Sequence, residues 1–480
     1  MISSEFISKI LGVSSSHNFP SVTTDSRKIT KDALFVALKG EFFDGHDFIP
    51  MALGNGAAGA LCRKGYSLPA KSSQDNVKLI HVDDPLTAYR KLASAWRRTF
   101  KIPVIAVAGS VGKTTTKELI AAILRGKWPE VLKTDGSQNG FVGIPMTLFE
   151  LRAEHGAAVI EIGIDEPGAM KNHLEIISPT ASVVTAIEAE HLDKLKNIQT
   201  VSREECLALR WVADRGGIVA ISADDPWIQR ELADAPLSWN PTQVVFYSFS
   251  KLPELWQTCI GGEQAAGFLK GSLSGQELIL DQLGLTGTRL GLPLPGKHNA
   301  RNCLAAVAIA RMLGMTSKEI QAGLKTFHGP DGRSQVKVLE PGLHVICDYY
   351  NASPGSVQAG LELLKETPGK TRWACLGDML ELGADEDQLH RDIAKLIIQN
   401  SLDQILLYGP RMKSLKDELI SLGFKGQVRH FQTHLELAEQ LLEGLEEGDV
   451  LLIKGSRGMK MEEVFKLLQE RWQEQWKKPS

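Results

Sequence analysis

The feature that most constrains the fold is a short apolar segment that runs into a glycine-rich turn and then into a helix-forming segment. VIAVA at 104–108 is followed by GSVGKTT at 109–115 and by KELIAAILRGKW. A buried strand, a loop and a helix in this order direct backbone N–H groups and the positive end of the helix dipole toward one anion. The pattern therefore predicts a phosphate-binding loop in an α/β domain.

Two side chains of this loop carry the predicted chemistry. Lys113 supplies positive charge to β- and γ-phosphates, and the Thr114 hydroxyl can hold Mg²⁺. The expected nucleotide contacts are Gly109, Ser110, Val111, Gly112, Lys113, Thr114 and Thr115. The loop is a short GxxGKTT variant, because Val107 stands where the longer pattern has its first glycine. An ordinary strand-to-helix turn is the alternative, but a lysine at a helix N-terminus opposes the macrodipole unless an anion is bound.

Length and charge limit the classes of protein. A chain of 480 residues exceeds one ordinary core, so several domains are expected. The formal net charge of -3 provides no field for nucleic acid or an anionic membrane. Apolar runs fall far short of the ~20 residues that span a bilayer, and the start lacks a secretory signal. We expect a cytoplasmic protein, monomeric by default, without nucleic-acid binding or membrane insertion.

The repeated order of strand and helix predicts an α/β chain with three domains, at 1–99, 100–328 and 329–480. The first has candidate strands around 33–38 and 78–82, with Ala/Gly-rich helical sequence between them. The second is a P-loop-type parallel sheet domain. The third is Rossmann-like, without a GxGxxG motif after its first strand; its expected strands are 344–348, 372–376, 404–408 and 450–454. The six cysteines form no CxxC pair, which favours buried free thiols.

Two polar residues follow strands of the second domain. Glu161 lies in the strand-like stretch AAVIEIG, and His191 comes just after another apolar run in TAIEAEHLDKL. A carboxylate among apolar residues is costly unless it meets a cation, and neutral imidazole is a metal ligand. Each residue alone could be an ordinary polar residue. Their shared position beside a phosphate loop favours a Mg²⁺ site.

Three polar blocks end strands of the third domain, DYYNASPGS, LGDMLELG and IKGSRG. Open parallel sheets bind ligands at the edge where their strands end, so the blocks are expected to gather there. The candidate residues are Asp348, Tyr350, Asn351, Asp378, Lys454, Ser456 and Arg457. The alternatives are a helix N-cap for Asp378 and solvated charges for Lys454 and Arg457.

With these motifs, the chain resembles the Mur ligase family, and its MurF-type members most. The resemblance rests on TTDSRKITKDALFVALKGEFFDGHDF, VIAVAGSVGKTTTKELIAAIL and LPLPGKHNARNCLAA, and on the three blocks of the third domain. The MurE-type DNPR motif is absent. A resemblance of this length implies the fold and the reaction of the family.

The reaction implied is ATP-dependent joining of D-alanyl-D-alanine to UDP-MurNAc-tripeptide through an acyl phosphate, in peptidoglycan synthesis. Domain one would grip the UDP-sugar, domain two would bind ATP and Mg²⁺, and domain three would present the dipeptide. By resemblance, the UDP-sugar contacts are Asp25, Ser26, Arg27 and His46, the residues near the nucleotide are His298, Asn299 and Asn302, and the residues for phosphate and nucleotide are Arg333 and Asp348.

The chain departs from the family pattern in three places. Residues 163–170 read GIDEPGAM where the family has GANHxGE, and Asn139 stands without its second asparagine. Glu205 aligns with the lysine that many Mur ligases carbamylate, so we hypothesise that Glu205 or the adjacent Glu204 supplies the Mg²⁺ carboxylate directly. The alternative is that both are solvated helix residues. Two other functions stay open, a Mur-type ligase with another acceptor or carboxylate, and a nucleotide-binding Mur-like protein without ligase activity.

Overall fold

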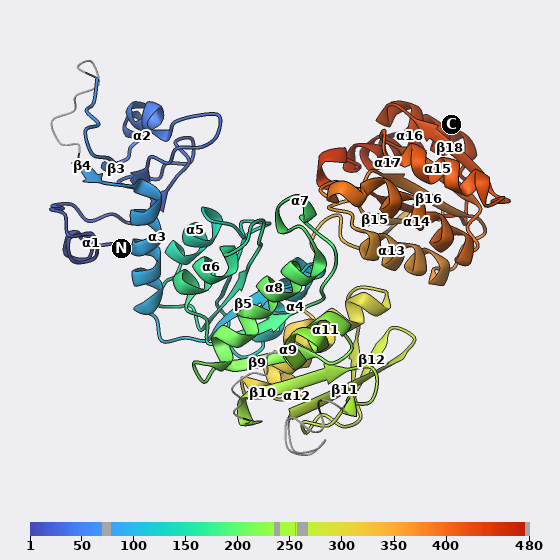
Figure 1. Ribbon diagram of the computed structural model, residues 1–480, viewed down its shortest axis with the longest axis horizontal. Helices are drawn as coiled ribbons and strands as arrows, with labels where there is room; N and C mark the ends of the chain where they lie inside the picture. Colours follow the sequence, from blue (N-terminus) through green and yellow to red (C-terminus); the bar gives the residue numbers. More distant parts are fainter. Residues whose placement is uncertain (70–77, 235–240, 255, 257–266, 476–480) are drawn as a thin grey trace. The chain divides into compact units, whose positions relative to one another are not determined.

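The computed structural model describes residues 1–69, 78–234, 241–254, 256 and 267–475. Helices and strands alternate along the chain, and the strands form three sheets (Figure 1). The chain makes two compact units. One consists of residues 1–106, 128–163 and 170–181, and the other of residues 107–127, 164–169 and 182–480. The predicted α/β class is confirmed.

The first unit contains a four-stranded parallel sheet in the order β1-β2-β3-β4. Its elements are α1 (Ser4–Leu11), β1 (Val22–Thr23), β2 (Leu34–Val36), η1 (Gly45–Phe48), α2 (Ile49–Gly54), β3 (Gly59–Arg63), β4 (Lys78–Val82) and α3 (Pro85–Arg98). The helical sequence expected between the two predicted strands is present as α2, but the same stretch also contains β3, which was not predicted. Ala60, Leu61 and Cys62 are fully buried there, and a short buried apolar run fits a strand as well as a helix.

Further along the chain, the first unit contains β6 (Val131–Lys133) paired in parallel with β7 (Ala157–Glu161). Helix α5 (Gly143–Phe149) packs against α3, and α6 (Ala169–Ile177) follows β7. All five residues of β7 are buried, including the carboxylate of Glu161 at its end. A charged side chain is thus placed at the end of an apolar strand, as the sequence predicted.

The second sheet has nine strands in the order β13-β12-β11-β10-β9-β8-β5-β7-β6. Its remaining strands are β5 (Val104–Ala108), β8 (Ala181–Val184), β9 (Ile218–Ser222), β10 (Val244–Ser248), β11 (Gly267–Ser274), β12 (Glu277–Asp281) and β13 (Thr288–Gly291). The sheet is mixed rather than parallel throughout, because β12 pairs antiparallel with both β11 and β13. Only Gly275 and Gln276 connect β11 to β12, and so short a connection allows only an antiparallel pair.

The helices of this region lie in the second unit, apart from α5 and α6. They are α4 (Lys113–Leu124), α7 (Leu192–Leu195), α8 (Ile198–Ala213), α9 (Pro226–Asp234), α11 (Lys297–Met312) and α12 (Ser317–Leu324), with η3 (Pro241–Gln243) before β10. Helix α11 packs along α4 and against β9 and β10. Five of its buried residues are alanines, which let the two helices approach closely. This packing brings the start of α11 to the start of α4, where the phosphate loop lies.

The C-terminal sheet has six strands in the order β14-β15-β19-β16-β17-β18. Its strands are β14 (Gln335–Leu339), β15 (Leu343–Asp348), β16 (Arg372–Gly377), β17 (Gln404–Tyr408), β18 (Gln427–Phe431) and β19 (Val450–Lys454). Its helices are α13 (Pro354–Glu366), η4 (Gly383–Asp385), α14 (Glu386–Gln399), α15 (Met412–Ser421), α16 (His434–Gly444), η5 (Arg457–Met459) and α17 (Glu462–Gln475). Only β14 runs antiparallel to its neighbour.

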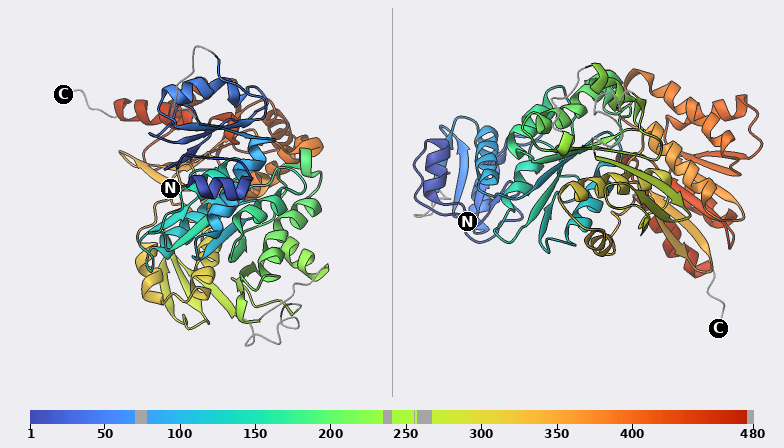
Figure 2. Two further views of the ribbon diagram at one scale, coloured as in Figure 1. Left: turned by 90° about the vertical axis from the view of Figure 1, so that its left-hand side faces the viewer. Right: turned by 90° about the horizontal axis from the view of Figure 1, so that it is seen from below.

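Alternate residues of these strands face opposite layers of helices. Ile346, Ala374 and Leu452 pack with α13, α14 and α15, whereas Cys347, Leu451 and neighbouring residues pack with α16 and α17. The views in Figures 1 and 2 show helices on both faces of this sheet. The strand order places the ends of β15, β19 and β16 side by side, so the three polar blocks of the sequence meet at one edge.

Five cysteines are buried free thiols, at positions 62, 206, 303, 347 and 375. Cys259 lies outside the described residues. Among the helices that the structure describes, none has the length and apolar character needed to cross a membrane.

Trp472 provides a test of the C-terminal packing. The side chain is fully buried between α17 and the sheet, so Trp472→Ala leaves a large cavity and should destabilise the C-terminal part by about 3–5 kcal/mol. Calorimetric unfolding of the full chain measures this loss as a lowered transition temperature. Glu470→Ala, an exposed change on the same helix, should leave that transition in place. Equal unfolding temperatures for both variants would contradict the assigned packing.

Candidate functional site

The phosphate loop requires glycine at two positions for steric reasons. Gly109 and Gly112 have φ values of +116° and +90°, which other residues rarely adopt. A Cβ atom on Gly109 would lie 2.4 Å from Thr185 Oγ1, and one on Gly112 would lie 2.5 Å from Asn302 Oδ1. The loop therefore passes so close to its neighbours that only glycine fits.

The loop is bonded along its length to the segment that follows β8. The Ser110 amide donates to the Ala186 carbonyl at 2.7 Å, and the Thr185 hydroxyl donates to the Val111 carbonyl at 2.6 Å. The Ser110 hydroxyl donates to the Glu188 carbonyl at 3.1 Å. Three bonds over so few residues hold the loop in one conformation. They also fix the direction of the N-terminus of the helix that follows the loop.

Lys113, Thr114 and Thr115 begin α4. The Lys113 ammonium donates to the Gly109 carbonyl at 2.5 Å and to the Ser110 carbonyl at 3.0 Å. Thr114 and Thr115 are 6% and 5% exposed. The lysine thus lies over its own loop at the helix N-terminus, where a phosphate group is expected to bind.

Glu205 on α8 binds the other side of the loop. Its Oε2 accepts the Gly109 amide at 2.7 Å, the residue is fully buried, and its Oε1 has no hydrogen-bond partner among the described residues. Burial raises the pKa of this carboxyl, and the nearby Lys113 charge and the Gly109 bond oppose the rise. The alternative of a solvated helix residue is therefore wrong for Glu205. Glu204 instead accepts the Gly168 amide at 3.0 Å.

Glu161 and Asn139 lie together in the first unit. The Asn139 side-chain amide donates to Glu161 Oε1 at 2.8 Å, and the Glu161 amide donates to the Thr134 hydroxyl at 3.0 Å. Glu161 is only 1% exposed. A buried carboxylate held by an amide donor keeps a defined orientation, which a metal ligand requires.

The start of α11 contributes two amides and an imidazole. Asn302 lies against Gly112 of the loop, and its side-chain amide donates to Asn299 Oδ1 at 3.5 Å. Asn299 donates to the Pro295 carbonyl at 2.8 Å, and His298 Nε2 lies 3.1 Å from the Ser334 hydroxyl. Burial lowers the pKa of His298. Of these residues, Asn302 is the one in contact with the loop.

At the C-terminal sheet edge, Asp348 and Lys454 form a buried ion pair. The Lys454 ammonium donates to Asp348 Oδ2 at 2.5 Å and to the Asn351 carbonyl at 3.1 Å, and Lys454 is 2% exposed. The alternative of a solvated charge is therefore wrong for Lys454. Asp348 Oδ1 also accepts the Ser334 amide at 2.9 Å, so this carboxylate joins the ends of three chain segments.

Tyr350 is flanked by two guanidinium groups. The Arg333 guanidinium carbon lies 4.1 Å from the ring centroid of Tyr350, and that of Arg457 lies 5.6 Å from it. Arg457 also pairs with Glu462 at 2.9 Å and is largely exposed. These distances are within the range of cation–π attraction, which keeps two positive charges at this sheet edge.

Ser456 and Asp378 connect the other two blocks. The Ser456 amide donates to the Asp378 carbonyl at 3.0 Å, and its hydroxyl donates to the Ala352 carbonyl at 3.2 Å. The Asp378 carboxylate is buried and accepts the amides of Met412 and Arg411 at 3.0 and 3.3 Å. Asp378 therefore caps the N-terminus of α15. Burial is the main cause that raises its pKa.

Of the predicted UDP-sugar residues, Arg27 is exposed, Asp25 is half-buried, and the other two are buried. Arg27 pairs with Asp25 at 2.9 Å, and the hydrogen bonds from Arg27 lower the pKa of Asp25 to about 2. Ser26 and His46 are 8% and 3% exposed. Arg27 is the group of this set that is open to a ligand.

Both ring nitrogens of His46 have protein partners. Nδ1 lies 2.5 Å from Asp44 Oδ1, and Nε2 accepts the Arg63 amide at 3.0 Å. A direct ring contact with a substrate would break one of these bonds, so the structure favours an indirect role for His46.

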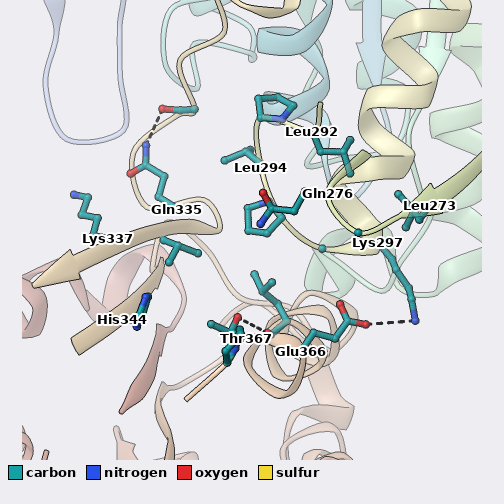
Figure 3. Close-up of a pocket in the computed structure, with 18 residues that line it drawn as sticks. Leu273, Gln276, Leu292, Leu294, Lys297, Gln335, Lys337, His344, Glu366 and Thr367 are labelled. Atoms are coloured by element: carbon teal, nitrogen blue, oxygen red, sulfur yellow. Dashed lines mark hydrogen bonds and ion pairs between the residues drawn. The ribbon is translucent and has the colours of Figure 1, made fainter. Parts of the chain in front are cut away.

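A separate pocket of about 970 Å³ lies beside the start of α11 (Figure 3). Leu292 and Leu294 line it together with His344 of β15 and Thr367 after α13. Lys297 and Glu366 at its border lie 3.5 Å apart. None of the predicted site residues lines this pocket, so it is distinct from the site above.

Comparisons with known proteins agree with the motifs. Three family models match the chain: the Mur ligase family catalytic domain at 18–97, the Mur ligase middle domain at 107–310, and the Mur ligase glutamate ligase domain at 332–457. A relative from Synechocystis is 34% identical over 91% of this chain and 89% of the relative. The chain belongs to the Mur ligase family.

Relatives and solved structures of Mur ligases cover nearly the whole chain. The Synechocystis protein and a Bacillus subtilis protein, which is 30% identical over 94% of this chain and 93% of the relative, are both named UDP-N-acetylmuramoyl-tripeptide–D-alanyl-D-alanine ligase. MurF from Acinetobacter baumannii has a TM-score of 0.82 at 26% identity, covering 98% of this chain and 99% of that chain. MurF from Thermotoga maritima, solved with ADP, has a TM-score of 0.77 at 24% identity and covers 95% and 98%.

A Mg²⁺ site in this Mur ligase depends on the ligands that its own side chains can supply. Within the described residues, no three His, Cys, Asp or Glu side chains lie close enough together to hold a metal ion. His191, with φ +51°, has Nδ1 2.6 Å from Glu381 Oε2. Mg²⁺ commonly takes one or two carboxylates and completes its shell with water and phosphate oxygens. The buried Glu205 Oε1 without a partner fits such a site.

Two residues of the site were overlooked in the sequence, Glu188 and Glu190. Glu188 Oε2 accepts the Ser353 hydroxyl at 3.0 Å, and Glu190 Oε1 lies 3.3 Å from Lys113 Nζ. Burial raises the pKa of both, that of Glu190 to about 7. The sequence did contain a signal for them, because TAIEAEH places two acids directly after an apolar strand. The same reasoning identified Glu161.

The ion pair of Lys454 and Asp348 yields a stability test. Lys454→Met leaves the Asp348 carboxylate buried without its cation and should cost about 3–5 kcal/mol. The double variant Lys454→Met, Asp348→Asn removes both charges and should recover most of the loss. Chemical denaturation of the three proteins measures the coupling. Additive losses in the double variant would mean that the two charges do not stabilise each other.

Proposed function

We propose that this Mur ligase joins D-alanyl-D-alanine to UDP-MurNAc-tripeptide with ATP, in peptidoglycan synthesis. The observation that carries the proposal is the match to proteins with this printed name over almost the full length of both partners. A third such relative, from Escherichia coli, is 32% identical over 94% of this chain and 93% of the relative. The products are UDP-MurNAc-pentapeptide, ADP and phosphate.

Three domains carry the three substrates in this proposal. Domain one, at 1–99, holds the UDP-sugar through Arg27 and its neighbours. Domain two, at 100–328, binds ATP, and domain three, at 329–480, presents the dipeptide. One family model falls inside each of these ranges, which supports the division.

ATP binding is supported by the geometry of the loop and by the ADP in the Thermotoga maritima relative. The loop amides and Lys113 receive the phosphates. Asn302 lies directly beside Gly112 of this loop. His298, Asn299, Arg333, Asp348, Tyr350 and Asn351 are proposed for the rest of the nucleotide. Asp378, Lys454, Ser456 and Arg457 are proposed for the dipeptide side.

The reaction proceeds in two displacements. A carboxylate oxygen of the tripeptide attacks the γ-phosphorus of ATP, ADP leaves, and an acyl phosphate forms. The amine of the dipeptide then attacks the acyl carbon, a tetrahedral intermediate collapses, and phosphate leaves with the bonding electrons while the amine loses its proton. Lys113 and the loop amides stabilise the negative charge that develops in the first step.

Magnesium completes the phosphate site in this proposal. Thr114, Glu161, His191 and Glu205 are the residues proposed to hold it, with Asn139 orienting Glu161. When bound, the ion neutralises charge on the phosphate oxygens. A monomeric, cytoplasmic protein remains our prediction.

A second candidate is a Mur-type ligase with another acceptor or carboxylate. Residues 163–170, which differ from the family pattern, are tied to their surroundings by different bonds. Asp165 pairs with Lys194 at 3.1 Å, and the Gly168 amide binds Glu204. Substrate contacts made by this block would therefore differ from those of other family members.

Phosphate release tests the function directly. Purified protein with ATP, Mg²⁺, UDP-MurNAc-tripeptide and D-Ala-D-Ala should release phosphate, and omission of any component should abolish the release. Mass spectrometry should detect the pentapeptide product. Release that needs the tripeptide but proceeds only with a different amine would favour the second candidate, and release from ATP alone would contradict both.

Glu205 offers a test of the metal carboxylate. Glu205→Ala should lower turnover by about 10²-fold or more and raise the Mg²⁺ concentration needed for half-maximal rate, since a buried metal ligand is lost. Glu205→Lys should recover part of the turnover when bicarbonate is added, because a lysine carbamate restores a carboxylate. Glu204→Ala is the matched control.

Unchanged turnover and Mg²⁺ dependence in Glu205→Ala would refute this role. Equal losses in Glu204→Ala and Glu205→Ala would assign the effect to α8 as a whole rather than to the metal carboxylate.

A further inference from the structure

Glu190 lies beside the phosphate-loop lysine, and the proposed reaction assigns it no task. Glu190 Oε1 is 3.3 Å from Lys113 Nζ, and the two side chains are only 15% and 13% exposed. A pair so far withdrawn from water is weakly screened by salt. The contact is therefore a strong local constraint on the lysine.

The backbone holds Glu190 in this place. The chain from Thr185 to Glu188 is bonded to the loop at Ser110 and Val111. Glu190 follows two residues later, immediately before His191 with its left-handed φ of +51°. The carboxylate is thus carried to the lysine by a segment that is itself attached to the loop.

The position of Lys113 shows the effect of this contact. Its ammonium donates to the Gly109 and Ser110 carbonyls of its own loop while it faces Glu190. A phosphate group needs the same ammonium protons that these acceptors take. Glu190 and a bound phosphate therefore compete for one cation.

A second carboxylate strengthens the competition. Glu205 accepts the Gly109 amide of the same loop, and its negative charge acts on Glu190. One lysine that shares its surroundings with two buried acids does not make an attractive site for a bare polyphosphate. Additional positive charge is needed at the loop before the phosphates bind well.

We propose that Glu190 is a positioning residue that holds Lys113 on the phosphate loop until a nucleotide phosphate displaces it, so that ATP without metal is disfavoured relative to its magnesium complex. This inference rests on the proposed function, because it assumes that the loop binds ATP. It assigns Glu190 no contact with the reacting atoms.

Calorimetric titration of the full chain with ATP tests the proposal, in EDTA and in excess Mg²⁺. Without metal, Glu190→Gln and Glu190→Ala should bind ATP about tenfold more tightly than the wild type, because the competing anion is gone. With Mg²⁺ the difference should be much smaller. Glu231→Gln, which removes a similarly buried carboxylate paired with Arg210 on α8, is the control and should leave metal-free binding unchanged.

The wild type should bind the magnesium complex of ATP normally. If both Glu190 variants then bind metal-free ATP as weakly as the wild type or more weakly, the role of Glu190 is overturned and the proposed function is not. A wild type that bound no ATP under either condition would instead overturn the proposed function. Glutamine keeps the size of the side chain and alanine removes it, so a folding defect in one variant leaves the other as the test. Steady-state kinetics at limiting Mg²⁺ should show a lowered KM for ATP in the variants, which a purely structural role would not produce.

Discussion

The hydrogen bond from the Gly109 amide to Glu205 is the interaction on which the central site depends. It joins the end of β5 to helix α8 where the carboxylate has no access to water. Without the amide, a buried charge would lose its donor, at a cost that can reach several kcal/mol. On its other contacts the same loop is bonded to Thr185, Ala186 and Glu188, and it passes too close to Thr185 for a side chain at Gly109.

The C-terminal sheet edge follows a different principle. There, three strand ends are joined by short polar contacts, from Lys454 to Asp348 and from Ser456 to the two neighbouring blocks. Each block alone is a loop with polar residues. Together they satisfy one another's backbone groups, which leaves Tyr350 and its two arginines at the edge of the sheet.

Structural features could be predicted from the sequence where the residues that determine them are adjacent in the chain. The strand, loop and helix at 104–124 could be read directly, because the apolar run, the glycines and the lysine are adjacent in the chain. The mixed central sheet could not, because direction depends on a two-residue turn within a stretch without clear periodicity. Strand β3 was missed because a buried run of small apolar residues has no period that separates strand from helix.

For the site, the residue types were predicted more reliably than their tasks. Asp378 was recognised as a helix cap or a ligand residue, but the helix that it caps begins at Met412, far along the chain. His46 was assigned to a ligand from resemblance, whereas its ring is bonded to Asp44 and to the distant Arg63 amide. Contacts of this kind come from tertiary packing, which a motif does not contain.

Glu188 has a consequence that reaches beyond the loop. Its carbonyl accepts the Ser110 hydroxyl, and its carboxylate accepts the Ser353 hydroxyl at the start of α13. A Cβ on Gly355 would lie 2.2 Å from the same carboxylate, so the helix end is closely fitted to it. Glu188 therefore connects the phosphate loop directly to the start of α13, so a movement of either one affects the other. Thermodynamic linkage makes such a coupling reciprocal. If a ligand bound at the loop changes the affinity for a second ligand at the start of α13, the second ligand changes the affinity for the first by the same factor.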